Sequence, residues 1–319
     1  MRALRFFEFG DPSKLSLVDL QDPRADAATA VVRIVAASVN PSDVKNVAGQ
    51  MEGAVLPRVP GRDFSGVVEQ GPPEWLGAAV WGTGGEIGFS EDGTHAERVA
   101  FPVAALVRKP DNLAHDVAAA VGVTFVVAWL GAIDYAAVRE GETVAVIGAG
   151  GGVGGAVVQI AKARGCRVIG VDRERPPHPA GALIDEFVLT EGDVAAQVRQ
   201  LTEGRGAEVV FDAVGGVMFE AALHSLRHRG RLIEISSTGK RRVEFDLIEF
   251  YHNESQVFGA DTRKLDPVAS AKILANLVPG FEDGHYEAPT LARAYPLAGG
   301  VAAYEAVARG TRGRVVLTM

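Results

Sequence analysis

The chain has 319 residues, of which 47% are hydrophobic and 23% are charged, and its formal net charge is −8. This composition is typical of a globular protein with a sizeable core, excludes a disordered chain, and leaves room for two domains. The negative net charge, with no basic run longer than Lys240–Arg242, argues against nucleic acid as a partner.

Cysteine usage and the terminal sequence restrict the compartment. Cys166 is the only cysteine, so neither an intrachain disulfide nor a cysteine-based structural zinc site can form. Residues 1–10 lack the apolar core and the cleavage site of a signal peptide, and we expect a cytoplasmic location. The longest uncharged stretch, residues 117–133, is short for a membrane span, so we expect a buried helix or helix pair there and no membrane contact.

The first 114 residues are predicted to be rich in β-structure. Short β-branched runs, separated by Gly, Pro and Asp, predict strands at residues 16–20, 30–36, 64–68, 79–81 and 96–101. A compact antiparallel barrel is the natural architecture for such a pattern. Within it, Asn40-Pro-Ser-Asp43 combines a turn with side chains that can cap a helix beginning near Ser42.

Residues 115–262 alternate apolar runs with helical patterns, which predicts a parallel, doubly wound sheet. The expected strands are residues 144–147, 168–171, 209–211, 232–235 and 257–258, and a last strand is expected at 314–317. Ligands of such sheets bind outside the carboxyl ends of the strands. The residues at or just after the ends of three of these strands are therefore candidate cofactor contacts: Val214, Gly215, Ser236, Ser237, Phe258 and Gly259.

A glycine cluster, Gly148–Gly155, joins the strand at 143–147 to a helix. A pyrophosphate needs bare backbone N–H groups at a helix N-terminus, and glycine removes the side chains that would hold it away. A glycine cluster alone can also be a packing turn. Here a strand precedes the cluster, and a helix, a second strand and a terminal acid come after it in that order. The G-x-G-x-x-G pattern can be framed on Gly150, Gly152 and Gly155, or on Ala149, Gly151 and Gly154.

The acid that ends the second strand, Asp172, lies twenty residues after Gly152. At that distance a carboxylate can accept hydrogen bonds from an adenosine ribose and repel a 2′-phosphate, which favours NADH. Arg173 and Arg175 favour NADPH, since an arginine can pair with the 2′-phosphate. The sequence leaves NAD(P)H open with NADH slightly favoured.

Five segments together resemble the medium-chain dehydrogenase/reductases, and among them the zinc-independent quinone oxidoreductases that include zeta-crystallin. The segments are Asn40–Asp43, Val59–Gly66, Ala149–Gly154, Asp212–Gly216 and Arg312–Leu317. The A-x-x-G-V-G pattern of that group selects the frame on Ala149, which makes Ala149, Gly151, Gly152, Val153 and Gly154 the cofactor contacts of this turn. The resemblance implies a Rossmann nucleotide domain, residues 115–262, inserted into a GroES-like barrel formed by residues 1–114 and 263–319.

Metal chemistry separates the branches of this superfamily. Zinc-using relatives coordinate the metal through a Cys, a His and a second Cys, and the matching positions here are Asn40, Arg62 and Val123. We therefore expect no zinc. His224 and His228, four residues apart on a predicted helix, could share a metal but are better explained as part of a basic helix end.

The remaining chemistry is hydride transfer from a reduced nicotinamide to a quinone or an α,β-unsaturated carbonyl compound. From the resemblance, Asn40 and Thr124 are the candidate catalytic hydrogen-bond donors, Thr124 also contacts the cofactor, and Asp43 orders its loop. Met51 stands where relatives often carry a tyrosine, so we expect either protonation by solvent or a substrate whose reduced form needs no positioned acid.

Two alternatives stay open at this point. One is a reductase of enoyl or acryloyl thioesters or of alkenals, which uses the same hydride geometry. The other is a non-catalytic protein that binds NAD(P)(H) as a sensor or structural component. The resemblance also implies a homodimer through an edge strand near Val257.

Overall fold

The computed structural model describes residues 1–319, and the chain divides into two compact units. The barrel unit comprises Met1–Val123, Thr262–Gly284 and Ala288–Met319. The sheet unit comprises Thr124–Asp261 and His285–Glu287. Residues 115–123 therefore belong with the barrel unit rather than beyond a boundary at 114, and residues 285–287 return to the sheet unit.

The barrel unit is built on a sheet with strand order β14-β15-β3-β4-β5-β7, to which β6 adds by pairing with β3, and on a separate β1-β2 hairpin. The strands are β1 (Arg2–Phe6), β2 (Leu15–Asp19), β3 (Thr29–Val39), β4 (Asp63–Gln70), β5 (Ala79–Gly82), β6 (Arg98–Pro102), β7 (Val107–Arg108), β14 (Leu291–Pro296) and β15 (Arg314–Thr318). The helices are α1 (Pro41–Val47), α2 (His115–Ala119), α9 (Pro267–Glu282) and α10 (Gly300–Ala308).

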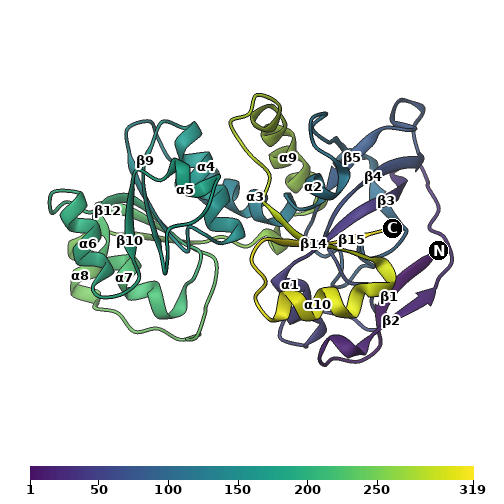
Figure 1. The fold of residues 1–319 in the computed structure, drawn as a ribbon, viewed down its shortest axis with the longest axis horizontal. Coiled ribbons are helices and arrows are strands. Elements are labelled where there is room, and N and C mark those ends of the chain that lie inside the picture. The colour runs from purple at the N-terminus through teal and green to yellow at the C-terminus, as the bar shows by residue number, and fades with distance from the viewer. The chain divides into compact units, whose positions relative to one another are not determined.

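The C-terminal strand completes this barrel, as the resemblance implied. β15 pairs antiparallel with β3, with Val316 opposite Ser38, and Figure 1 shows the yellow end of the chain beside the purple N-terminal strands of the same unit. Phe64 and Phe101 meet edge to face in the core, with ring centroids 4.9 Å apart. Apolar residues on alternate positions of the paired strands face this core.

The sheet unit contains a parallel sheet with strand order β10-β9-β8-β11-β12-β13. Its strands are β8 (Thr143–Ile147), β9 (Arg167–Asp172), β10 (Glu186–Leu189), β11 (Ala207–Asp212), β12 (Leu226–Glu234) and β13 (Gln256–Gly259). Its helices are α3 (Gly122–Trp129), which begins in the barrel unit, a π-helical turn (Leu130–Tyr135), α4 (Gly152–Ala163), α5 (Ala180–Leu183), α6 (Val194–Leu201), α7 (Phe219–His224) and α8 (Leu247–His252).

This strand order confirms the doubly wound α/β fold expected from the sequence. Every residue of β8 is buried, because a central parallel strand is covered on both faces, and its β-branched run suits that position. The chain proceeds from β8 to one side through β9 and β10, then returns to β11 on the other side. The gap between β8 and β11 is therefore the topological switch point.

The expectation of a helix carrying both His224 and His228 is wrong. α7 ends at His224, and His228 lies on β12, where it faces Glu254 at 3.3 Å. The Arg-rich run that follows α7 forms part of strand β12, because pairing in the parallel sheet overrides a weak helical preference.

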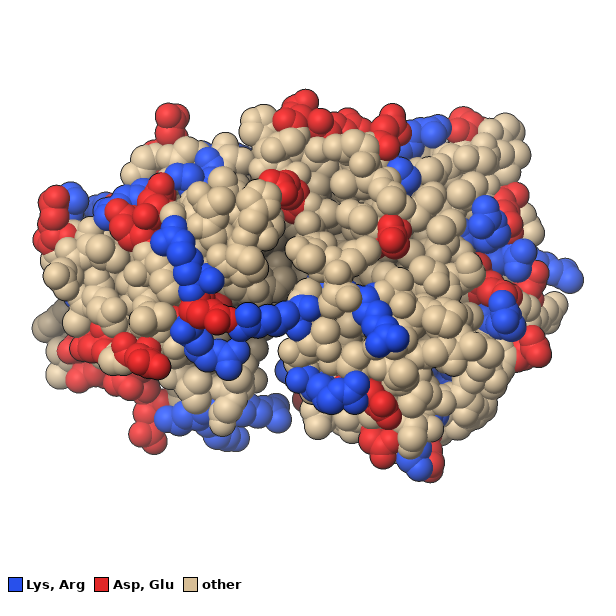
Figure 2. Space-filling view, in the orientation of Figure 1, with Lys and Arg blue, Asp and Glu red and all other residues tan.

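No helix is both long and apolar enough to cross a membrane. On the face shown in Figure 2, acidic and basic side chains are interspersed rather than gathered into a broad basic field.

Candidate functional site

The loops that the sequence singled out gather at the carboxyl edge of the parallel sheet. β8 and β11 are neighbours, with Ile147 opposite Asp212, so the glycine turn and the loop after β11 leave the sheet on either side of the switch point. Gly215 pairs with Ser237, and the Thr238 amide donates to the Val214 carbonyl at 2.9 Å. The structure thus brings Val214, Gly215, Ser236 and Ser237 together, while Phe258 and Gly259 end the adjacent strand β13.

The glycine turn has the geometry of the frame on Ala149, Gly151 and Gly154. A Cβ on Gly154 would lie 2.0 Å from the Gly148 carbonyl oxygen, a distance that no side chain can occupy. A Cβ on Gly155 would meet nothing nearer than 3.7 Å. The third glycine of a dinucleotide turn is needed for close packing of helix on strand, and Gly154 is the residue under that constraint.

The N-terminus of α4 is open. Gly151 is its N-cap and no side chain caps it, and Gly150, Gly151 and Gly152 are exposed. The first backbone N–H groups of a helix have no intrahelical acceptor, so those of Gly152 and Val153 are left for a ligand. Together with the positive end of the helix dipole, these groups suit a pyrophosphate. The residues present therefore fit a dinucleotide.

Asp172 is fixed against this turn at the end of β9. Its Oδ2 accepts from the Gly150 amide at 2.8 Å and its Oδ1 accepts from the Arg173 amide at 2.7 Å. Arg175 donates instead to the carbonyls of Gly181 and Ile184, at 3.1 and 2.8 Å. Arg175 therefore stabilises its own loop, whereas the exposed Arg173 directly follows the acid in the chain.

A pair of buried carboxyl groups lies at the same edge of the sheet. Asp212 on β11 is opposite Glu234 on β12, and both Glu234 oxygens and Asp212 Oδ2 are buried without a hydrogen-bond partner. Burial raises the pKa of Glu234 to about 8, with a further contribution from the charge of Asp212. The sequence did not single out Glu234, although an acid inside the apolar run 232–235 was a visible signal.

Glu234→Gln tests this burial through the pH dependence of stability. The pKa of Glu234 is raised from 4.5 to about 8, so the folded chain keeps a proton that the unfolded chain releases. The stability that the protonated Glu234 gives the folded chain is therefore fully present below pH 4.5 and is lost as the pH rises through 8. We expect the variant to match the wild type near pH 4.5 and to exceed its free energy of unfolding at alkaline pH by about 1–2 kcal/mol, discounted for solvent screening.

Thermal unfolding across that pH range checks this prediction. Glu244→Gln, at an exposed position, is the matched control and should leave the pH dependence of thermal unfolding unchanged. An equal gain for Glu234→Gln at every pH would show that its carboxyl is ionised throughout.

In the barrel unit, Asn40 belongs to a buried polar network. Its Nδ2 donates to Asp63 Oδ2 at 2.9 Å, and its Oδ1 accepts from the Arg314 guanidinium at 2.6 Å. Asn40 is 2% exposed. Its amide is thus engaged on both sides within the barrel, which leaves the second Nδ2 hydrogen available for the expected contact with substrate.

Asp43 orders the loop before α1, in the way the sequence suggested. Its Oδ2 accepts from the Asn40 backbone amide at 2.7 Å, which closes a capping box on this helix. Burial raises the pKa of Asp43 to about 7, and the positive charge of Arg62 partly opposes that rise. Asp43 is therefore an internal group rather than a surface acid.

Thr124, the second proposed catalytic residue, is 4% exposed and is the first residue of the sheet unit. The backbone of the preceding Val123 is tied to the barrel, because its amide donates to Asp63 Oδ1 at 3.0 Å. Asn40 and Thr124 thus belong to different units.

The positions that match zinc ligands in relatives do not fit a catalytic zinc. They hold Asn40, Arg62 and Val123, and no group of three or more His, Cys, Asp or Glu side chains could hold a metal. Arg62 is a buried cation, which would repel a metal ion at this place.

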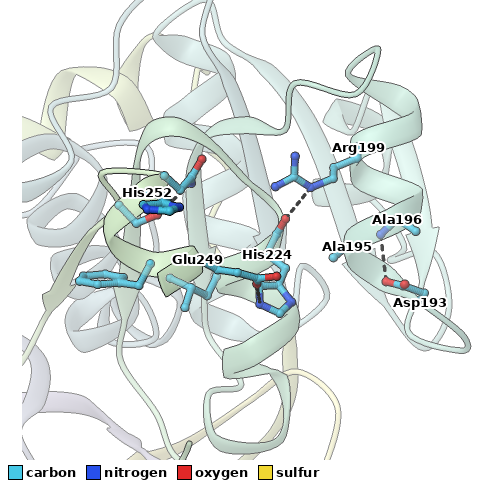
Figure 3. A pocket seen from close by; sticks show the side chains of 11 residues that line it. Asp193, Ala195, Ala196, Arg199, His224, Glu249 and His252 are labelled. Atoms are coloured by element: carbon cyan, nitrogen blue, oxygen red, sulfur yellow. Dashed lines mark hydrogen bonds and ion pairs between the residues drawn. The ribbon is translucent and has the colours of Figure 1, made fainter. Parts of the chain in front are cut away.

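A separate cavity of about 600 Å³ opens among α6, α7 and α8 of the sheet unit (Figure 3). His224 Nε2 lies 2.7 Å from Glu249 Oε2, and Arg199 donates to the His224 carbonyl at 2.9 Å. These polar groups are paired with one another, and the cavity contains none of the residues predicted for the cofactor.

Comparison with known proteins agrees with this geometry. Residues 152–275 match the sequence model of the zinc-binding dehydrogenases, and residues 26–111 match that of the alcohol dehydrogenase GroES-like domain. A zinc-type alcohol dehydrogenase-like protein of Schizosaccharomyces pombe is 37% identical over 294 residues, which cover 90% of this chain and 87% of that protein.

Two further relatives cover the whole chain. The quinone oxidoreductase of Homo sapiens is 27% identical over 329 residues, which cover 100% of this chain and 98% of that protein. The crystal structure of an NAD-dependent alcohol dehydrogenase has 30% identity and a TM-score of 0.89, with 100% of both chains covered.

The fold, the dinucleotide turn and these relatives define the class, an NAD(P)H-dependent oxidoreductase. The chain belongs to the medium-chain dehydrogenase/reductase superfamily, in its quinone-oxidoreductase-like group. The resemblance noted in the sequence is thereby confirmed.

Proposed function

We propose that the protein is a zinc-independent reductase that transfers a hydride from NAD(P)H to a quinone or an α,β-unsaturated carbonyl compound. The observation that carries this proposal is the bare glycine turn at the switch point, where a Cβ on Gly154 would strike the Gly148 carbonyl at 2.0 Å. Support for the acceptor class comes from the quinone oxidoreductases among the relatives. The residues at the zinc positions support a reaction without metal.

The sheet unit supplies the binding half of this mechanism. The amides of Gly152 and Val153 take the pyrophosphate at the N-terminus of α4, Asp172 takes the adenosine ribose, and the segment at Val214 and Gly215 bounds the far end of the dinucleotide. The nicotinamide, when bound, supplies the hydride. The chain's own task is to hold donor and acceptor in line and to exclude water from them.

Oxidation of NAD(P)H with a panel of acceptors tests the activity. We expect turnover with 1,4-benzoquinone or 9,10-phenanthrenequinone, and acrolein and crotonyl-CoA report on the enone and thioester alternatives. Firm cofactor binding without oxidation above background for all four would indicate the non-catalytic sensor instead.

We propose NADH as the preferred cofactor. Asp172 is held against the turn by Gly150 and Arg173, so its charge faces the place of a 2′-phosphate, and Arg175 is engaged elsewhere. Titration should show tighter binding of NADH than of NADPH by about tenfold, since a misplaced like charge costs on the order of 1.4 kcal/mol.

Asp172→Asn removes the charge but keeps an oxygen for the Gly150 amide, and it should reduce that preference. Arg173→Ala is the control, because it removes the neighbouring cation and should raise the preference for NADH. Tighter binding of NADPH by the wild type would show that the acid does not select the cofactor.

For assembly, we propose a homodimer through the edge strand β13. Val257 on this strand is 41% exposed, and Leu247 and Tyr251 of the nearby α8 are 66% and 58% exposed. Paired edges would cover these apolar side chains. Sedimentation that shows only monomer at micromolar concentration would exclude this interface.

A further inference from the structure

Asp212 and Glu234 form a pair of carboxyl groups beneath the loop that follows β11. They end the neighbouring strands β11 and β12, lie opposite each other in the parallel sheet, and both belong to the sheet unit. Asp212 is fully buried, and Glu234 is half-buried with both of its carboxyl oxygens out of reach of solvent. Neighbouring buried carboxyl groups resist carrying two negative charges at once.

Hydrogen bonds determine which of the two acids carries the charge. Asp212 Oδ1 accepts from the backbone amides of Val214 and Gly215, at 2.9 and 2.8 Å. Neither carboxyl oxygen of Glu234 has a hydrogen-bond partner. Donated hydrogen bonds favour an ionised carboxylate, and burial without them favours the neutral acid. Burial raises the pKa of both groups, that of Glu234 to about 8, where the charge of Asp212 adds to the effect. Glu234 therefore holds the proton.

The backbone of the loop packs directly on this pair. Gly215 has a φ of +63°, and a Cβ there would lie 2.5 Å from Glu234 Oε1 and 2.0 Å from the Ser236 carbonyl oxygen. The Thr238 amide donates to the Val214 carbonyl at 2.9 Å, which joins the loop to the segment that follows β12. A charge on Glu234 would therefore act on both segments at this edge of the sheet.

The other charged groups around Glu234 lie at the surface. The loop 213–217 has no titratable side chain, and the residue of β13 opposite Glu234 is Gly259. Asp212 is the only charge that shifts the pKa of Glu234. The charged residues of the flanking segments are all exposed, namely Glu220, Lys240–Arg242, Glu244, Asp246, Glu249 and Asp261.

We propose that Glu234 is a positioning residue for the cofactor, because its proton keeps the loop at Val214 and Gly215 in place on the sheet. The inference rests on the proposed function, in which these two residues bound the far end of the dinucleotide. Loss of the proton puts a second negative charge beside Asp212 and against the Gly215 backbone, and the loop moves away from the sheet. Only the protonated protein then binds NADH, and binding at alkaline pH takes up one proton from the solvent.

Titration with NADH at about pH 7 and about pH 9, followed by its fluorescence, tests this coupling. We expect the dissociation constant of the wild type to rise by about tenfold between these values, since an acid with a pKa of about 8 is protonated in roughly nine-tenths of the molecules at the first and one-tenth at the second. Glu234→Gln should bind equally well at both, because its amide stays neutral and can donate to the unpartnered Oδ2 of Asp212.

Glu220→Gln is the matched control, because Glu220 is an exposed acid on α7, the helix that follows the same loop. It should keep the pH dependence of the wild type. Asp212→Asn removes the charge that opposes ionised Glu234 and keeps an oxygen for the two loop amides, so it should reduce the loss of affinity at alkaline pH. A purely structural role of Glu234 would change the affinity of Glu234→Gln by the same factor at both pH values.

Tryptic cleavage at Lys240–Arg242 reports on the loop without any cofactor, because this exposed run follows Thr238, which the loop holds. At about pH 9 we expect the wild type to be cut at these sites about fivefold faster than Glu234→Gln, and at about pH 7 equally fast, since proteolysis follows the population of open forms. Mass spectrometry identifies the fragments. Comparison of the two proteins at one pH cancels the pH dependence of trypsin itself.

The outcomes separate this proposal from the proposed function. A wild-type dissociation constant that is the same at both pH values, or one that rises equally in Glu234→Gln, overturns the coupling. A protein that binds no NADH at either pH contradicts the proposed function instead, and the tryptic comparison then tests Glu234 alone. Faster cleavage of the wild type at about pH 9 supports its role in the loop, and equal cleavage overturns that role.

Discussion

Gly154→Ala is expected to lower the affinity for NADH by at least about tenfold, on the order of 1.4 kcal/mol, because α4 must move away from the glycine turn. The added Cβ would lie 2.0 Å from the Gly148 carbonyl oxygen and 3.0 Å from the Ala149 Cα, and both obstacles are backbone atoms. No side-chain rotation can relieve such a contact. We also expect a loss of about 1–3 kcal/mol in the free energy of unfolding, as for other overpacked sites.

The neighbouring Gly155→Ala is a close control. It lies in the same helix, its Cβ would meet nothing nearer than 3.7 Å, and alanine is the better helix former. This variant should bind NADH as the wild type does and gain about 0.5–1 kcal/mol in stability. Titration by NADH fluorescence and urea unfolding compare the two. If both variants bind the cofactor equally well, the dinucleotide does not depend on the approach of α4 to the turn.

The sequence predicted those elements whose pattern is dictated locally. Strands such as β8 and β9 were recognised because a β-branched run between turn signals is typical of a buried strand. Asp172, the acid that ends β9, was predicted from its spacing alone. The strands β1, β7, β10 and β14 were not predicted. β7 and β10 are short, β14 is largely exposed, and β1 contains no β-branched residue, so packing partners rather than their own composition define these strands.

The boundary between the units also depends on partners that are distant in sequence. α2 was assigned to the nucleotide domain on its helical pattern, yet it contacts β3 and β4 of the barrel. One cause is Asp63, whose carboxylate holds the Val123 amide at 3.0 Å, and no local pattern reveals a hydrogen bond across sixty residues. The expected boundary at 114 was thus set by the helical pattern of the sequence, whereas the observed division is set by contacts and hydrogen bonds between residues that are distant in the chain.

The candidate site shows the same contrast. The glycine turn could be read from the sequence, because backbone access is a local requirement. The engagement of Asn40 by Asp63 and Arg314 could not, because Arg314 arrives from the far end of the chain on β15. Arg62 was visible in the sequence as a departure from a zinc ligand, but its lack of an acceptor at Nε emerges only when the surrounding segments are in place.

Arg314→Leu is expected to cost about 3–5 kcal/mol of folding free energy, since it leaves the Asp63 carboxylate buried without its cation. Asp63 is fully buried and lies 3.7 Å from the Arg314 guanidinium, which also donates to Ser38 at 2.5 Å and to Asn40 at 2.6 Å. Urea unfolding followed by tryptophan fluorescence reports on this unit through Trp75 and Trp81. Arg309→Leu, which breaks an exposed pair with Glu305, is the control and should change stability by less than about 0.5 kcal/mol.

A second substitution distinguishes the lost charge from lost packing. Asp63→Asn, added to Arg314→Leu, removes the charge of the unpaired carboxylate and keeps an oxygen that accepts from the Val123 amide. The Asn40 side-chain amide can rotate so that its oxygen accepts from the amide nitrogen introduced at position 63. The double variant should therefore recover about 1–3 kcal/mol relative to Arg314→Leu, a coupling within the range measured for residues in one network. A strictly additive loss would mean that Arg314 supports β15 by its bulk, and that the charge of Asp63 is balanced by its hydrogen bonds from Asn40 and Val123 alone.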